Sequence, residues 1–169
     1  MSYTIAAITK GASIKIRVKG LFDFEGVYKL IADWIINSRQ MEFHETRYKD
    51  KVETAFGNEL KIETMGERRV SEFIKYYIYV KYELWEAKEV KVVIDGKPVK
   101  RMQGRMHIEI KGDIVADWQN RFKKYPKLMG FLIKTVFKNE LEVKHADPLE
   151  HDMHAFAAKI KRFLNIDAE

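Results

Sequence analysis

A strict alternation of apolar and polar side chains over residues 73–85 constrains this chain more than any other feature. The segment reads FIKYYIYVKYELW. A period of two residues is that of a β-strand with one buried face and one wet face. The residues of the predicted buried face are Ile74, Tyr76, Ile78, Val80, Tyr82 and Leu84, and those of the wet face are Lys75, Tyr77, Tyr79, Lys81 and Glu83.

The same parity continues on both sides of a tight turn. Asp95 and Gly96 both tolerate a positive φ, which predicts a two-residue hairpin between two strands. Gly104, inside the second of these strands, predicts a bulge or a bend in a curved sheet. The pattern therefore predicts an antiparallel meander with a continuous apolar face, to which these residues also belong: Val90, Val92, Ile94, Met102, Met106, Ile108 and Ile110.

Other segments complete one α+β domain over residues 1–169. Shorter alternations predict further strands at residues 13–19, 41–49, 60–65 and 114–118. Asp23 is an N-cap for a helix that runs to about residue 38, and a second helix begins near Pro126. Asp147 and Pro148 predict the start of a third helix, which ends near Asn165. We therefore predict a curved antiparallel sheet of five to seven strands packed against three helices.

This order of elements resembles the helix-grip fold of the START-like superfamily, in which a C-terminal helix lies in a curved sheet and a cavity forms between them. The resemblance covers most of the chain as topology: the strand at residues 13–19, the helix from Asp23, the meander over residues 60–118 and the helix from Pro148. It departs from the family's pattern because one helix precedes the meander and two follow it. Helix-grip proteins include lipid carriers, hydrophobic-ligand binders, cyclases and hydrolases, so the resemblance alone does not choose among these functions.

If the sheet grips a helix, inward-facing side chains can line a pocket for an apolar or amphipathic small molecule such as a lipid. Buried tyrosines need hydrogen-bond partners that a ligand can supply, and methionines suit an adaptable apolar site. The alternative is that these side chains only fill a core. The expected ligand-binding residues are Tyr76, Tyr82, Met102, Met106, Phe156 and Ile160.

The wet face of the meander suggests a second function, nucleic-acid binding. The formal net charge is +6, and residues 68–111 hold eleven Lys or Arg against six Asp or Glu. Basic side chains interleaved with tyrosines suit single-stranded nucleic acid, which is bound by stacking and by phosphate neutralisation. The alternative is an ordinary solvated sheet face. The candidate nucleic-acid residues are Lys75, Tyr77, Tyr79, Lys81, Arg101 and Arg105.

No motif for catalysis or for a cofactor stands out. The four serines lie outside any G-x-S-x-G setting, and the chain has no Gly-rich phosphate loop. We therefore expect no catalytic residue and no cofactor, which favours a non-enzymatic protein. His151 and His154 are three residues apart on a predicted helix and are further candidates for a divalent metal site. Their spacing matches no established zinc motif, and a solvent-facing polar surface explains them as well.

The sequence also carries expectations about location. It has no cysteine, which excludes disulfides and thiolate metal sites and indicates a reducing compartment. The start, MSYTIAAITKG, lacks the basic residues and the long apolar run of a signal peptide. No segment approaches the roughly 20 apolar residues of a transmembrane helix. We expect a cytoplasmic protein, and no feature of the sequence indicates its oligomeric state.

Overall fold

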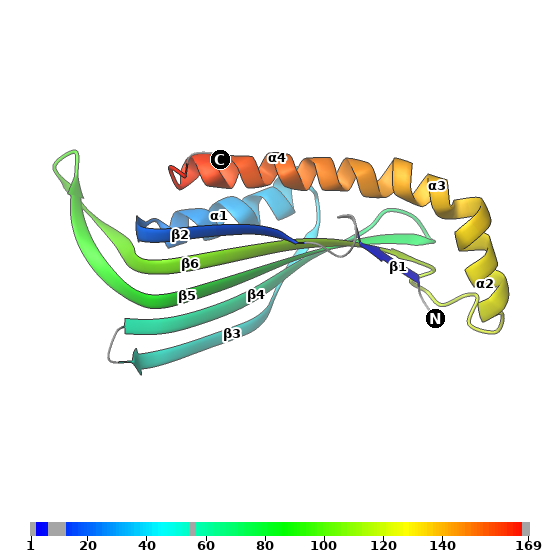
Figure 1. Cartoon of the computed structure of the whole chain (residues 1–169), viewed down its shortest axis with the longest axis horizontal. Helices are drawn as coiled ribbons and strands as arrows, with labels where there is room; N and C mark the ends of the chain where they lie inside the picture. The colour runs from blue at the N-terminus through cyan, green and yellow to red at the C-terminus, as the bar shows by residue number, and fades with distance from the viewer. Residues whose placement is uncertain (1–2, 7–12, 55–56, 167–169) are drawn as a thin grey trace.

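The chain folds as a curved antiparallel sheet with helices on one face (Figure 1). The computed structural model describes residues 3–6, 13–54 and 57–166. In these residues the sheet has six strands, and β6 is paired with β5 along one edge and with β1 and β2 along the other. The predicted α+β class and curved antiparallel sheet are therefore confirmed. The strands are β1 (Tyr3–Ala6), β2 (Ile14–Phe22), β3 (Glu42–Thr54), β4 (Gly57–Arg69), β5 (Ile74–Ile94) and β6 (Lys97–Ala116).

The alternation that opens β5 places its two faces as predicted. Ile78, Val80 and Leu84 are almost completely buried on the face that carries the helices. On β6, Ile110 lies opposite Val80 and Met106 lies opposite Leu84, and both are almost completely buried, so apolar cross-strand pairs stabilise the centre of the sheet. Strand pairs in antiparallel register keep the two sets of side chains on opposite faces.

Beyond Trp85 the predicted parity is wrong, because a β-bulge inserts one extra residue into β5. The pairing passes from Trp85 opposite Arg105 to Lys88 opposite Gln103, which sets three steps on β5 against two on β6. One extra residue moves all later side chains of the strand to the other face. Val90, Val92 and Ile94 therefore do not continue the buried face.

Gly104 permits this bulge from the neighbouring strand. A Cβ atom at Gly104 would lie 2.8 Å from the carbonyl oxygen of Trp85 and 2.9 Å from that of Glu86. The bulged backbone of β5 thus occupies the space of a side chain on β6. The prediction of a bulge or bend near Gly104 is confirmed, although the extra residue lies on the other strand.

The hairpin that joins β5 to β6 has the predicted two-residue turn. Asp95 and Gly96 have φ values of 49° and 75°, and Ile94 pairs with Lys97. Past the bulge the two strands bend away and project beyond the helices (Figure 1). The hairpin tip is open to solvent at Val93, which is 74% exposed.

The first helix begins where the sequence indicates. Asp23 accepts a hydrogen bond from the backbone nitrogen of Gly26 at 3.0 Å and caps α1 (Phe24–Asp33). The helix continues as one π-helical turn, η2 (Trp34–Ser38), so the predicted end near residue 38 is confirmed.

The C-terminal region is helical from Pro126 without the predicted restart at Asp147. Ala146, which precedes Asp147, has helical φ and ψ, and the chain before it is already helical. Pro148 lacks a backbone N–H, and the turn before it widens to a π-helix instead of ending the helix. The segments are α2 (Pro126–Leu132), η3 (Ile133–Phe137), α3 (Lys138–Leu141), η4 (Glu142–Ala146) and α4 (Asp147–Phe163).

The main core lies between the sheet, α1 and α4. Met153, Phe156 and Ile160 of α4 are buried on the sheet, and the Phe156 ring stacks on Trp34 with centroids 4.1 Å apart. A smaller core forms under α2, where Met129 and Ile133 pack on Ala116. Among the helices in the described ranges, none is long and apolar enough to cross a bilayer.

Candidate functional site

The six predicted ligand-binding residues lie together in or beside the main core. Tyr82, Met106, Phe156 and Ile160 are at most 3% exposed, while Tyr76 and Met102 pack at the border of the same cluster. Their side chains pack in or against the same buried apolar cluster. Packing in the core therefore explains these six side chains, and their contact with a ligand stays a prediction.

The two tyrosines of this set differ in their polar contacts. The Tyr76 hydroxyl lies 2.5 Å from Nδ1 of His145 in η4, which links the sheet to the helical layer. The Tyr82 hydroxyl is buried and has no hydrogen-bond partner within the described residues. Burial raises the pKa of Tyr82 above its usual range, so this hydroxyl keeps its proton.

An open hollow of about 400 Å³ lies where the C-terminal end of α4 meets the start of α1 and the β5–β6 hairpin. We call it the α4-end hollow. Three of its apolar side chains are large and exposed, with Leu21 at 52%, Ile94 at 43% and Phe163 at 43%. Its lining residues are Leu21, Phe22, Asp23, Ile94, Arg101, Phe163, Leu164 and Asn165. No single stretch of the sequence predicts this site, because its residues come from four separate segments.

Close packing between the two helices shapes this hollow. A Cβ atom at Gly26 would lie 2.7 Å from the Phe163 ring, so α1 and the end of α4 touch at a residue without a side chain. Asn165, with a φ of 53°, then turns the chain out of α4. The Phe163 ring thus lies over the start of α1, at the wall of the hollow.

An ion pair forms the polar part of the α4-end hollow. The Arg101 guanidinium lies 3.3 Å from the second carboxylate oxygen of Asp23, whose first oxygen caps α1. Both side chains also line a smaller hollow of about 210 Å³ beside Met102. The pair therefore separates two adjoining hollows. Arg101 belongs to this site, although the sequence analysis grouped it with the other nucleic-acid candidates.

The remaining nucleic-acid candidates do lie on the outer face, opposite the helices, but acidic residues accompany them. Lys75 is only 10% exposed in its side chain and pairs with Glu67 at 2.8 Å. Tyr77 and Tyr79 stack on each other at 6.0 Å between ring centroids. Arg105 binds both carboxylate oxygens of Glu86, at 2.9 and 3.2 Å.

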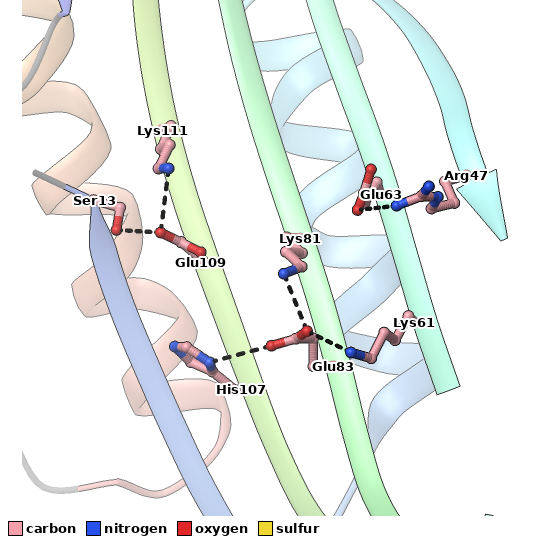
Figure 2. Close-up of polar contacts among 9 residues, drawn as sticks. All are labelled: Ser13, Arg47, Lys61, Glu63, Lys81, Glu83, His107, Glu109 and Lys111. Carbon is pink, nitrogen blue, oxygen red and sulfur yellow. Dashed lines mark hydrogen bonds and ion pairs between the residues drawn. The ribbon is translucent and has the colours of Figure 1, made fainter. Parts of the chain in front are cut away.

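Glu83 is the centre of a polar cluster on this face (Figure 2). Its carboxylate, 14% exposed, lies 3.2 Å from Lys61 Nζ, 3.1 Å from Lys81 Nζ and 3.8 Å from His107 Nδ1. Burial opposes ionisation of Glu83, but the hydrogen bonds from Lys81 and Lys61 outweigh it and lower its pKa. The carboxylate is therefore charged at neutral pH and neutralises the lysines around it.

Strand register brings these acids to the lysines. In the strand register, Lys81 lies opposite Glu63 of β4 on one side of β5 and opposite Glu109 of β6 on the other side. Glu109 in turn accepts a hydrogen bond from Ser13 at 2.5 Å, which lowers the pKa of Glu109, and lies 3.5 Å from Lys111. A count of charges along residues 68–111 leaves out Glu63 and Glu67, which come from β4.

Neither candidate histidine joins a metal-binding group. His151 is exposed, and His154 lies 3.7 Å from Glu150 one turn earlier on α4. Within the described ranges, the group of potential ligand atoms within 4.8 Å of one another is instead Glu42, His44 and Glu67. Two of these three are exposed, and Glu67 is already paired with Lys75. This group has no further feature that indicates a metal.

Comparison of the chain with models of known protein families and with curated protein sequences finds no match.

Proposed function

We propose that this protein binds an apolar or amphipathic small molecule in the α4-end hollow, between the curved sheet and the C-terminal helix. The observation that carries the proposal is the convergence of Leu21, Ile94 and Phe163, all large and exposed, on one hollow of about 400 Å³. Ligand sites are typically hollows of this size with mostly apolar walls and a few placed polar groups.

The polar groups favour an amphipathic ligand over a purely apolar one. Arg101 lies at the hollow beside Asp23, and a ligand with an acidic head group can share the guanidinium. The acyl or ring portion of the ligand would then cover the exposed apolar side chains, which gains free energy in proportion to the area removed from water.

We include the resemblance to the helix-grip fold in this proposal, with the ligand bound where the C-terminal helix ends over the sheet. The interior positions, including Tyr82 and Met106, are filled by packed side chains, so the ligand would reach the core only through the hollow. The Tyr82 hydroxyl, which lacks a partner within the described part of the chain, is the polar group that a deeper ligand could satisfy.

Native mass spectrometry of the purified protein, compared with its denatured mass, tests the proposal first. We expect an extra mass of a few hundred daltons, and binding of a fluorescent long-chain fatty acid. Ile94→Asp should weaken binding of the fatty acid at least about tenfold, because it places a charge in the apolar wall.

The matched control is Val93→Asp, one residue earlier on the same hairpin. Val93 is more exposed and does not line the hollow, so its substitution should leave binding unchanged. A clean native mass together with no binding of the fatty acid would refute the proposal. Equal loss in both variants would place the ligand elsewhere.

A further inference from the structure

The outer face divides into a neutralised half and a basic half. On the neutralised half, each lysine around Glu83 has a carboxylate within 4 Å. On the basic half, Arg17 and Lys19 of β2 are exposed and form no ion pair within the described residues. Their cross-strand partners on β6 are His107 and Arg105, neither of which is an acid. Positive charge therefore remains along β2.

A second open hollow, of about 380 Å³, lies on this basic half, and we call it the β2 hollow. Arg17 and Lys19 line one side of it, and Trp85, Arg105 and His107 line the other. An adjoining hollow of about 300 Å³ shares Lys19 and Arg105 and adds Lys88 and Glu86. Glu86 is the ion-pair partner of Arg105, so Lys19 and Lys88 are the cations that have no ion pair there within the described residues. The concentration of cations favours a ligand with several negative charges.

The aromatic side chains that line the β2 hollow indicate which kind of polyanion it can bind. The Trp85 and His107 rings are nearly parallel, with an angle of 19° between them and 6.4 Å between centroids. Trp85 is partly exposed at the hollow. Aromatic rings beside cations on a sheet match what an unpaired nucleic-acid strand requires, since its bases stack on the rings while its phosphates lie at the cations.

The same features argue against a duplex or a membrane as the partner. A duplex keeps its bases stacked inside, so it would leave the Trp85 ring unused. A membrane surface is bound through apolar side chains that enter the lipid, whereas the exposed side chains of β2 at this hollow are the cations Arg17 and Lys19. The net charge of +6 would draw any polyanion toward the protein, and the aromatic wall then selects a single strand.

We propose that the β2 hollow binds single-stranded nucleic acid, with phosphates at Arg17 and Lys19 and a base stacked on Trp85. This site is separate from the α4-end hollow and does not depend on the small-molecule proposal. It also differs from the nucleic-acid surface predicted from the sequence, because Lys75, Lys81 and Arg105 are paired with Glu67, Glu83 and Glu86. Arg17 and Lys19, by contrast, have no ion pair within the described residues.

Fluorescence anisotropy with single-stranded DNA and RNA of about 20 nucleotides tests this proposal, with salt varied from about 50 to 200 mM. We expect binding that weakens steeply with salt. Arg17→Ala with Lys19→Ala should reduce the slope of log affinity against log salt by about 1.4, because each lost phosphate contact accounts for about 0.7 with single strands. Trp85→Leu should weaken binding at least about fivefold without changing this slope.

Matched variants separate the site from net charge and from folding. Lys123→Ala with Lys124→Ala removes the same charge from an exposed turn far along the chain and should leave the slope unchanged. Trp85→Phe keeps a stacking ring and should retain most of the affinity, and thermal unfolding checks that each variant is folded. No binding at low salt, or equal effects of the two double variants, would overturn the proposal. Binding of anionic vesicles that needs Arg17 and Lys19, without binding of oligonucleotides, would also overturn it.

Discussion

The two parts of β5, on either side of the bulge at Glu86 and Ala87, show how differently one strand can be held. From Ile74 to Leu84 the strand is covered by helices on one face and by ion pairs on the other. From Lys88 to Ile94 the same strand pairs only with β6 and projects past the helices (Figure 1). We call these the covered part and the projecting part.

The two parts of β5 are alike in backbone pairing and differ in side-chain burial. Both parts have a continuous ladder of antiparallel pairs with β6. Only the covered part has buried apolar side chains, and hydrophobic burial is the dominant favourable contribution to folding. The projecting part instead presents apolar side chains at its tip, and one of them, Ile94, lines the α4-end hollow. We therefore expect the covered part to supply most of the stability of the sheet. We expect the ligand to bind where the projecting part begins to leave the helices.

The largest predicted effect comes from truncating a side chain in the covered part. Ile78 is fully buried, so Ile78→Ala should lower the free energy of unfolding by about 2–5 kcal/mol, through lost burial and a residual cavity. The matched change in the projecting part, Val93→Ala, should alter it by less than about 0.5 kcal/mol. Urea unfolding measures both. Similar losses in the two variants would contradict the division of the strand.

Local chemistry explains which features of the fold the sequence could predict. The Asp95 and Gly96 turn and the Asp23 cap each depend on a few adjacent residues, and the structure has both. The alternation of the covered part was likewise readable, because burial between two layers enforces the period.

The features that could not be predicted depend on residues far apart in the sequence. The bulge requires Gly104 on the opposite strand, and the ion pair between Lys75 and Glu67 requires the register that sets β4 beside β5. Asp147 and Pro148 carry a normal helix-start signal, which the preceding helical residues override. Both hollows collect residues from several segments, so no single stretch of sequence identifies either one.

The boundary between the two parts should be sensitive to a single methyl group. Gly104→Ala places a Cβ within 3.0 Å of three backbone atoms of β5, so the bulge must shift. We expect a loss of about 1–3 kcal/mol in the free energy of unfolding. Gly130→Ala, in α2, meets nothing within 4 Å and should stabilise the protein by about 0.5–1 kcal/mol. An unchanged stability for Gly104→Ala would mean that the bulge is not fixed by this contact.

The outer face of the covered part should contribute less than its core. Glu83→Gln removes the charge that Lys61 and Lys81 contact, while keeping the shape of the side chain. We expect a loss of about 1–2 kcal/mol at neutral pH, since hydrogen bonds to charged groups are stronger than neutral ones. Glu72→Gln, in an ion pair with Arg121 that is largely exposed, should have a smaller effect. If the two variants are equally stable, the Glu83 cluster is no stronger than a surface ion pair.

The smallest effect should come from the hydrogen bond between Tyr76 of the covered part and His145 of η4. Burial lowers the pKa of His145, with Glu140 raising it and Lys144 lowering it by smaller amounts. A neutral imidazole with its proton on Nε2 accepts at Nδ1 a hydrogen bond from the Tyr76 hydroxyl, 2.5 Å away. The His145 imidazole becomes protonated at about pH 6.5 in the unfolded chain and only at lower pH in the folded chain. Stability should therefore fall as pH drops below about 6.5.

Urea unfolding at about pH 5 and pH 7.5 measures this contribution, since the pKa values of Glu83 and Glu109 are lowered and these carboxylates stay charged at both pH values. Burial raises the pKa of the Asp113 carboxyl, so a variant of His145 is needed to separate the two groups. In His145→Gln the group cannot titrate, so the loss between the two pH values should be smaller than in the wild type. His151→Gln, at an exposed position on α4, should keep the wild-type loss. If His145→Gln also keeps it, then protonation elsewhere causes the change, and the covered part is held to η4 by packing alone.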